Sequence, residues 1–320
     1  MIRTRSLVSG FLSFSAAAAL TLCSAGGATA APAASDEKKT PTVVSAVVDS
    51  TGVADYWTAD RMRQAVPGEV LSGKALERGN RSSVDTVKKG KSSKIKGTRA
   101  KAEAPATVKH IGKVFFTMGG ANYVCSGNAV TSANRSTVAT AGHCTMDGLG
   151  QEAENFAFVP AYENGERPYG TWTATALYAP IGWSSGGDMT YDTAFAVVAP
   201  DETGRLLTDV VGGSGVAFNQ AKGQYYTSYG YPASSPFTGE TLRSCAGTAR
   251  PDTINPGFGT QGIPCDMNGG SSGGPWLIGS GPGGFQNSIN SYGYKGSKVL
   301  YGPAWDDVIK DTYTVAQASL

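Results

Sequence analysis

The sequence has 320 residues, of which 16 % are charged and 43 are glycine. This length suits one large domain or two modest ones. The low charge, with abundant Gly, Thr, Ser, Val and Tyr, favours a strand-rich and loop-rich protein over a helical bundle. The formal net charge of +2 conceals a basic N-terminal part and an acidic remainder.

Residues 1–30 have the features of a secretory signal peptide. Arg3 and Arg5 form a positive n-region, and Leu7 to Leu22 is an apolar h-region. The A-x-A site at Ala28 to Ala30 then predicts a mature chain that starts near Ala31.

A membrane helix is the weaker interpretation, because the small residues after Leu22 are typical of a processing site. A lipoprotein anchor at Cys23 is disfavoured, since Leu22 occupies the position where a small residue is needed. No later stretch approaches the eighteen apolar residues of a membrane span. We therefore expect a secreted, extracellular protein with no membrane partner once the signal is removed.

Four cysteines remain after Cys23 leaves with the signal: Cys125, Cys144, Cys245 and Cys265. An oxidising compartment favours two disulfides, and four cysteines allow three pairings. We predict the nearest-neighbour pairs Cys125–Cys144 and Cys245–Cys265, which close two short loops. A metal site is disfavoured, because there is no C-x-x-C spacing and the chain has only two histidines. No feature requires a metal or an organic cofactor, and a calcium site on an acidic surface loop stays open.

Residues 31–105 form a basic leader, in which 14 Lys and Arg face 9 Asp and Glu. Residues 106–320 carry 11 Lys and Arg against 16 Asp and Glu, so the two parts attract one another. The stretch from Lys88 to Ala106 has little to bury and is interpreted as a disordered, protease-accessible linker. It lacks an aromatic platform, which argues against nucleic acid as a partner. Within the leader, Thr58 is the predicted N-cap of a short helix that ends before Pro67.

After Pro105, short apolar runs alternate with turn residues. Most runs have four to eight residues rich in Val, Thr, Phe and Tyr, and Gly, Asn or Pro separates them. This pattern predicts an all-β fold, either one barrel or a pair of barrels. The last run is the best candidate for a helix, because Trp305, Val308, Ile309 and Thr312 lie three or four residues apart.

His110 and His143 are the two imidazoles available as a general base. His143 lies in T-A-G-H-C, directly before a predicted disulfide cysteine, so a crosslink would fix its orientation. His110 lies between the linker and the first predicted strand and is interpreted as an exposed surface residue.

The sequence GSSGG at 270–274 matches the G-x-S-x-G nucleophile elbow of α/β-hydrolases. That fold needs a histidine after the serine, and none follows Ser272. The subtilisin order would place the acid at or before the basic leader. The order that remains is His, Asp, Ser. Asp192 directly precedes a buried-looking strand and is favoured as the acid over Asp188, which lies in a glycine-rich loop.

T-A-G-H-C at 140–144 and G-S-S-G-G-P at 270–275, with D-T-A at 192–194, resemble the chymotrypsin-like (trypsin-fold) serine peptidases in their secreted bacterial branch. The resemblance covers the chain from about His110 to the C-terminus. It implies two packed six-stranded antiparallel β-barrels, which with the predicted C-terminal helix gives the all-β fold class. His143 and Asp192 would come from the first barrel and Ser272 from the second. The segment from Tyr56 resembles pro-regions of secreted actinobacterial proteases.

The resemblance also implies roles for residues near the triad. Ser272 rather than Ser271 is the nucleophile, because the family serine directly precedes Gly-Gly-Pro. The backbone N–H groups of Gly270 and Ser272 would form the oxyanion hole. The S-Y-G at Ser291, Tyr292 and Gly293 resembles the segment that pairs with substrate backbone as an added strand.

The sequence departs from the family pattern at two places. Ser271 stands where animal members carry an Asp that pairs with the new N-terminus, so activation by N-terminal insertion is not expected. We predict instead that residues 31–105 cover or template residues 106–320 and are then removed. Asp266 lies where trypsin-like members bind Lys or Arg, but the intervening cysteine is missing, and a structural Asp fits as well. Glutamate-specific relatives use a histidine after the serine, so that preference is disfavoured, while elastase- or chymotrypsin-like cleavage stays open.

The sequence therefore predicts a monomeric secreted serine endopeptidase. Its partners would be protein or peptide substrates and its own pro-region. Two other functions remain open: a catalytically inactive homologue that serves as a binding module, and an esterase that uses the same triad.

Overall fold

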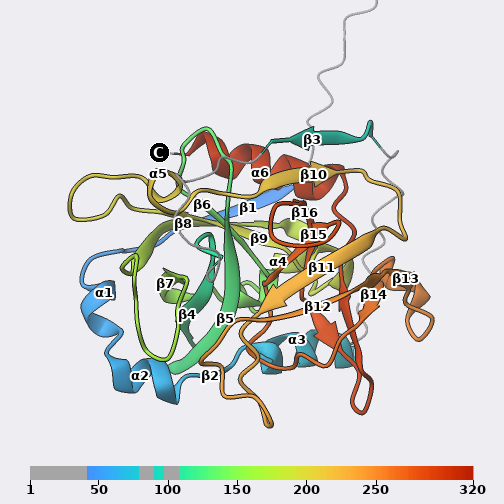
Figure 1. The fold of residues 1–320 in the computed structure, drawn as a ribbon, viewed down its shortest axis with the longest axis horizontal. Helices are drawn as coiled ribbons and strands as arrows, with labels where there is room; N and C mark the ends of the chain where they lie inside the picture. The colour runs from blue at the N-terminus through green and yellow to red at the C-terminus, as the bar shows by residue number, and fades with distance from the viewer. Residues whose placement is uncertain (1–41, 79–89, 97–107, 320) are drawn as a thin grey trace, which may run out of the picture. The chain divides into compact units, whose positions relative to one another are not determined.

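A computed structural model describes residues 42–78, 90–96 and 108–319 (Figure 1). Residues 40–320 belong to one compact unit, and the other unit, residues 1–39, lies outside the described residues. The predicted signal peptide and most of the predicted linker therefore also lie outside them. No helix of the described ranges is long and apolar enough to cross a membrane.

Six antiparallel strands close into a barrel in the N-terminal half of residues 108–319, the described part of the chain that follows the leader. They pair in the order β8-β7-β4-β5-β6-β9, and β8 pairs again with β9 to complete the ring. Their bounds are β4 (Ile111–Met118), β5 (Ala121–Val130), β6 (Thr137–Thr140), β7 (Glu154–Pro160), β8 (Trp172–Pro180) and β9 (Ala194–Val198). Gly119 and Gly120 connect β4 to β5 with φ angles of 58° and 79°, which suit a two-residue hairpin turn. All eight residues of β4 are buried.

The C-terminal half consists of two sheets. The six-stranded sheet has the order β12-β11-β15-β16-β10-β3, and the four-stranded sheet has the order β13-β14-β18-β17. The strands of this half are β10 (Gly215–Phe218), β11 (Tyr225–Gly230), β12 (Arg243–Thr248), β13 (Arg250–Pro251), β14 (Gln261–Pro264), β15 (Pro275–Ile278), β16 (Phe285–Ile289), β17 (Tyr292–Gly293) and β18 (Val299–Gly302). A disulfide between Cys245 of β12 and Cys265, which follows β14, links the two sheets. The predicted all-β class is confirmed, although this half is two sheets and not one closed six-stranded ring.

The predicted C-terminal helix is confirmed as α6 (Asp307–Ala318). The side chain of Asp306 caps its N-terminus by accepting hydrogen bonds from the N–H groups of Val308 and Ile309. The ring of Tyr313 lies 5.6 Å from Phe195 of β9 and 5.5 Å from Phe218 of β10, measured between centroids. The helix therefore packs against both halves at once. Other short helical segments lie in connections: η1 (Gly142–Cys144), α4 (Ile181–Ser184), η2 (Met189–Tyr191), α5 (Leu207–Val211) and η3 (Pro256–Phe258).

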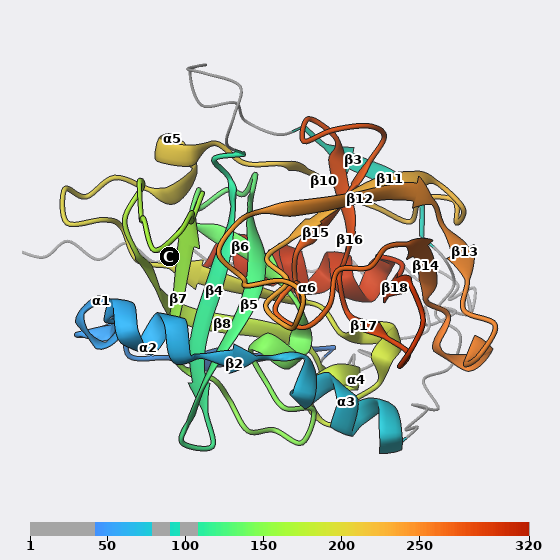
Figure 2. The same ribbon diagram turned by 60° about the horizontal axis from the view of Figure 1, so that its bottom comes forward.

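The leader is more ordered than the sequence predicted. The helix expected after Thr58 is present as α2 (Ala59–Gln64), with the Thr58 hydroxyl as its cap. Further leader elements are β1 (Val43–Val47), α1 (Val53–Tyr56), β2 (Val66–Pro67), α3 (Glu69–Arg78) and β3 (Ser93–Ile95). Three of them extend sheets of residues 108–319: β1 pairs with β8, β2 with β5 and β3 with β10. Trp57 is fully buried, and its indole N–H donates to the carbonyl of Asn155 over 2.6 Å. Figure 2 shows α1, α2, β2 and α3 following one another across the lower side of the view.

Candidate active site

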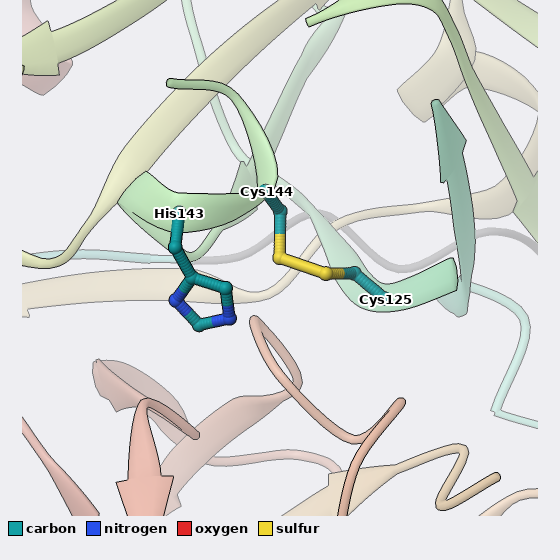
Figure 3. A group of neighbouring side chains, drawn as sticks. All are labelled: Cys125, His143 and Cys144. Atoms are coloured by element: carbon teal, nitrogen blue, oxygen red, sulfur yellow. A yellow bond between two sulfur atoms is a disulfide. The ribbon is translucent and has the colours of Figure 1, made fainter. Parts of the chain in front are cut away.

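His143 lies in η1, and a disulfide holds this turn in place. Its neighbour Cys144 is bonded to Cys125 of β5, with an S–S distance of 2.05 Å. Figure 3 shows the imidazole extending from η1 to one side of that bond. The disulfide thereby fixes the backbone at His143 to the barrel wall, and this restricts the orientation of the imidazole ring.

Cys125, His143 and Cys144 are also the one group of potential metal ligands in the part of the chain that the structure describes. Both sulfur atoms belong to the disulfide. Metal ligation by cysteine requires a free thiolate, so this group does not fit a metal ion. The histidine is left for acid–base chemistry.

Asp192 follows η2 and holds His143 at two points. Its Oδ1 accepts the backbone N–H of His143, and its Oδ2 is hydrogen-bonded to His143 Nδ1, each over 2.8 Å. Both side chains are fully buried. Bonding at Nδ1 leaves the lone pair on Nε2, where a general base needs it. Asp188 instead caps η2 by accepting the N–H of Thr190 over 2.9 Å.

Ser272 lies at the junction of the two halves. Its carbonyl accepts the N–H of Ser126 in β5 over 2.7 Å, which ties the serine loop to the first barrel. Gly273 has φ 79°, and a Cβ there would collide with the side chain of Thr140, three residues before His143. The residue after Ser272 therefore packs against the segment that leads into η1. His143 Nε2 is buried and has no hydrogen-bond partner among the described residues.

The loop that precedes Ser272 presents free backbone donors. Gly270 has φ 93°, which favours glycine, and an added Cβ would lie 2.7 Å from the carbonyl oxygen of Tyr231. Ser126 Oγ donates to the Gly270 carbonyl over 2.9 Å and fixes that peptide. Within the described chain, no hydrogen bond is formed by the N–H of Gly270 or of Ser272. Two unsatisfied donors beside a serine can stabilise an oxyanion.

The other serine of the pair is held by the second half. The Ser271 carbonyl accepts from the Asn290 side chain over 2.9 Å, and its N–H donates to the Asn268 carbonyl over 3.1 Å. Both Ser271 and Ser272 line a cavity whose other lining residues come from the second half and from α3. The choice of Ser272 as nucleophile stays a prediction.

A cavity of about 380 Å³ opens beside Ser272. Ser291, Tyr292 and Gly293 are among its lining residues, and their predicted role in substrate binding stays a prediction. The Ser291 hydroxyl donates to Asp192 Oδ2 over 2.5 Å, so this residue also contacts the acid. Asp266 lines the cavity as well, but it is exposed and does not form a closed, charged floor.

Leader helix α3 covers the same cavity, a feature that the sequence analysis missed. Glu69, Ser72 and Leu76 line the cavity together with Ser272. Leu71 is 4 % exposed and packs into the main core, and the i, i+4 spacing of this residue and buried Ala75 is the signal that could have revealed the contact. Just before the helix, the N–H of Gly68 donates to the carbonyl of Val124 in β5 over 2.9 Å.

Two predicted site residues are buried in this chain, in which α3 lines the cavity. With α3 in place, His143 is 0 % exposed and Ser272 is 4 % exposed. Burial raises the pKa of Glu69, while the charge of His143 and the hydroxyl of Ser234 lower it by smaller amounts. Outside the cavity, His110 is half-buried rather than exposed, and its Nδ1 is 2.8 Å from Asn128 Oδ1.

Comparison with solved structures assigns the fold to one family. Protease Anisep from Arthrobacter nicotinovorans is 61 % identical over 70 % of this chain and all of its own, with a TM-score of 0.66. The thermostable serine protease AL20 from an extremophilic microorganism is 49 % identical over 67 % of this chain and 99 % of its own, with a TM-score of 0.64. A Glu endopeptidase shares the fold at 20 % identity and a TM-score of 0.52. The chain therefore belongs to the bacterial chymotrypsin-like serine proteases and is a serine endopeptidase.

Two further comparisons give no relative over most of the chain. No family model matches the chain. An extracellular metalloprotease from Bacillus subtilis (strain 168) is 36 % identical over 70 residues, which is 22 % of this chain and 21 % of that protein. The chain thus matches about a fifth of the length of this relative.

Proposed function

We propose that the protein is a secreted endopeptidase in which Ser272 is the nucleophile, His143 the general base and Asp192 the acid that orients it. The observation that supports this most is the double contact of Asp192 with His143, through the backbone N–H and through Nδ1. It sets the tautomer in which Nε2 can accept a proton. The buried, unpartnered Nε2 is the group that would take the proton from Ser272.

The proposed reaction is hydrolysis of a peptide bond through an acyl-enzyme intermediate. Ser272 Oγ attacks the substrate carbonyl as its proton passes to His143 Nε2, and the carbonyl oxygen becomes an oxyanion. The N–H groups of Gly270 and Ser272 stabilise that charge, an effect worth about 3–4 kcal/mol in the transition state for a single donor. The tetrahedral intermediate then expels the amine, which takes the proton from His143. Water hydrolyses the acyl-enzyme by the same steps in reverse order.

We further propose that residues 31–105 are a pro-region that keeps the enzyme inactive until they are removed. The contacts of Glu69, Ser72 and Leu76 with the cavity beside Ser272 support this role. The strand pairings of β1, β2 and β3 would hold the pro-region on the peptidase region. Expression of residues 106–320 alone tests the folding role: normal yield of active enzyme would show that the leader is dispensable for folding.

Active-site labelling with an organophosphonate tests the triad. The mature enzyme should label on Ser272, and Ser272→Ala should abolish labelling while Ser271→Ala retains it. The reverse pattern would make Ser271 the nucleophile, and absence of any label would point to a binding module. A peptide-library digest then separates a peptidase from an esterase and gives the preferred residue before the cleaved bond.

A further inference from the structure

Asp252 is a buried carboxylate that the triad does not use. It is 2 % exposed and lies between β13 and η3. Its Oδ1 accepts the backbone N–H groups of Ile254 and Asn255 over 2.8 and 3.1 Å, which closes the turn. Its Oδ2 accepts the hydroxyls of Tyr292 and Tyr294 over 2.8 and 2.6 Å. One carboxylate therefore holds both a loop and two tyrosines of the cavity wall.

The two tyrosines are fixed on their other sides as well. The ring of Tyr292 stacks on Tyr301 of β18, with centroids 5.2 Å apart and planes 10° apart. Its hydroxyl also meets Thr260 Oγ1 at 2.6 Å. The hydroxyl of Tyr294 accepts from Asn255 Nδ2 over 2.7 Å. Neither ring can shift without breaking contacts to Asp252 or to its turn.

Strand β17 is a short edge strand beside the cavity. Tyr292 and Gly293 make up the whole strand, which lies at the end of its sheet and pairs only with β18 among the described strands. Its backbone borders the cavity beside Ser272, and Gly293 is exposed. A two-residue edge strand with one partner has few hydrogen bonds of its own, so side chains must set its position.

Consecutive residues here bond to different buried acids. The Ser291 hydroxyl donates to Asp192, and the Tyr292 hydroxyl donates to Asp252. The first bond links the segment to the triad, and the second fixes it from the far side. A displacement of the Tyr292 end therefore changes the distance between Ser272 and the edge of β17.

We propose that Asp252 is a positioning residue that, through Tyr292 and Tyr294, sets the edge of β17 for pairing with the backbone of an extended peptide substrate. This inference rests on the proposed function of Ser272. It predicts that several substrate residues before the cleaved bond contribute to binding and that this contribution depends on Asp252. Substrates that reach only the bond itself do not use the edge and do not depend on Asp252.

The ionised form of Asp252 suits this role, because a carboxylate can accept all four of its hydrogen bonds at once. Desolvation alone would raise its pKa, but the donors Tyr294, Asn255, Tyr292 and Ile254 together hold the pKa below its ordinary value. Burial in turn raises the pKa of Tyr294 to about 12, so its hydroxyl keeps the proton that it donates.

The test compares substrates of two lengths on the mature enzyme secreted from the full-length chain. Asp252→Asn and Tyr294→Phe should each lower kcat/KM for a tetrapeptide amide about tenfold, mostly through KM, because each removes a hydrogen bond that involves a charged group. A single-residue N-acyl ester should change less than twofold. Tyr226→Phe is the matched control, since it removes the buried hydroxyl that donates to Asn287 over 2.8 Å, away from the cavity. It should leave the ratio of the two substrates unchanged.

Equal losses on both substrates, or no loss on either, would overturn the proposal. The same split in Tyr226→Phe would show a general structural effect and would also overturn it. If Asp252→Asn fails to fold, Tyr294→Phe decides alone, because that residue is only half-buried. Organophosphonate labelling of each variant at Ser272 separates this outcome from failure of the triad: an unlabelled wild-type enzyme contradicts the proposed function, whereas a labelled one with no substrate split contradicts only the role of Asp252.

Discussion

Ser291 donates its hydroxyl to Asp192 Oδ2 over 2.5 Å, and this bond connects the substrate-side wall of the second half to the acid of the first. The same oxygen is bonded to His143 Nδ1. The acid therefore reaches its full set of partners only when the two halves are docked. If the proposed triad is correct, catalysis depends on this junction, and each residue there has a testable role.

Asp192→Asn should lower kcat by about 10⁴, because an amide at this position stabilises the wrong tautomer of His143. The measurement is kcat on a peptide amide, corrected by active-site titration. Asp188→Asn is the control, since an asparagine still caps η2 through the N–H of Thr190. Comparable losses in the two variants would contradict the choice of Asp192.

Leu71→Ala should loosen the leader. The side chain is 4 % exposed, and truncation of a buried leucine costs about 2–5 kcal/mol. We expect the uncleaved chain to label faster at its active-site serine. Val70→Ala is matched to it on the same helix, because Val70 is 49 % exposed and should have no such effect. Equal labelling of the Leu71→Ala and wild-type precursors would argue against a covering role for α3.

The pH dependence of leader release should come in part from Glu69. Its pKa is raised by burial in the docked leader, so the docked form binds this proton more tightly than the released form. Docking is therefore favoured most below the ordinary carboxyl range and weakens as the pH rises through the raised pKa. Glu69→Gln should activate more slowly than wild type at pH 7 and at the same rate near pH 4, about the ordinary carboxyl pKa.

The control for this experiment is Glu77→Gln, which changes an exposed glutamate on the same helix. His143 is the charged partner that opposes the effect, because its positive form favours the carboxylate. Each chain is incubated at one of the two pH values and then returned to neutral pH, and the readout is the fraction of active sites that label there. A Glu69→Gln profile parallel to wild type at both pH values would rule out this contribution.

Gly270→Ala should abolish the oxyanion hole. The substitution places a Cβ 2.7 Å from the Tyr231 carbonyl in a backbone with φ 93°. Gly279→Ala is the control, because it introduces the same backbone strain without a steric collision. Gly279 has φ 96°, and nothing lies within 4 Å of an added Cβ. We expect Gly279→Ala to cost about 1 kcal/mol of stability and to keep its activity. Gly270→Ala should lose about 10² or more in kcat, and similar activities in the two variants would contradict the assignment.

Local chemistry made much of this fold predictable. The helix at Asp307–Ala318 follows from its apolar spacing, and the strands follow from short apolar runs between glycines. The motifs around His143 and Ser272 could be recognised in the sequence, because tight turns favour glycine and a disulfide requires cysteine. The contact of Asp192 with His143 could be anticipated from chain order together with the buried strand that follows Asp192.

The order of the leader, the role of Asp252 and the two sheets of the second half depend on long-range contacts, which could not be predicted from residue patterns. The stretch from Lys88 to Ala106 was interpreted as a disordered linker, although Ser93–Ile95 within it forms β3. The buried positions of Trp57 and Leu71, which anchor the leader, were not predicted. Asp252 gave no signal, since a lone aspartate in a loop is ordinary until two tyrosines forty residues later bond to it. The splitting of the second half into two sheets depends on pairing register, which apolar runs do not specify.

The most direct measurement is labelling of the secreted chain by an organophosphonate before and after leader removal, with the labelled peptide identified by mass spectrometry. The account predicts slow labelling of the intact chain, fast labelling after cleavage, and a label on Ser272 in both. Labelling of the intact chain at the mature rate would contradict the proposal that the leader blocks the active site. A label on Ser271 would contradict the proposal that Ser272 is the nucleophile.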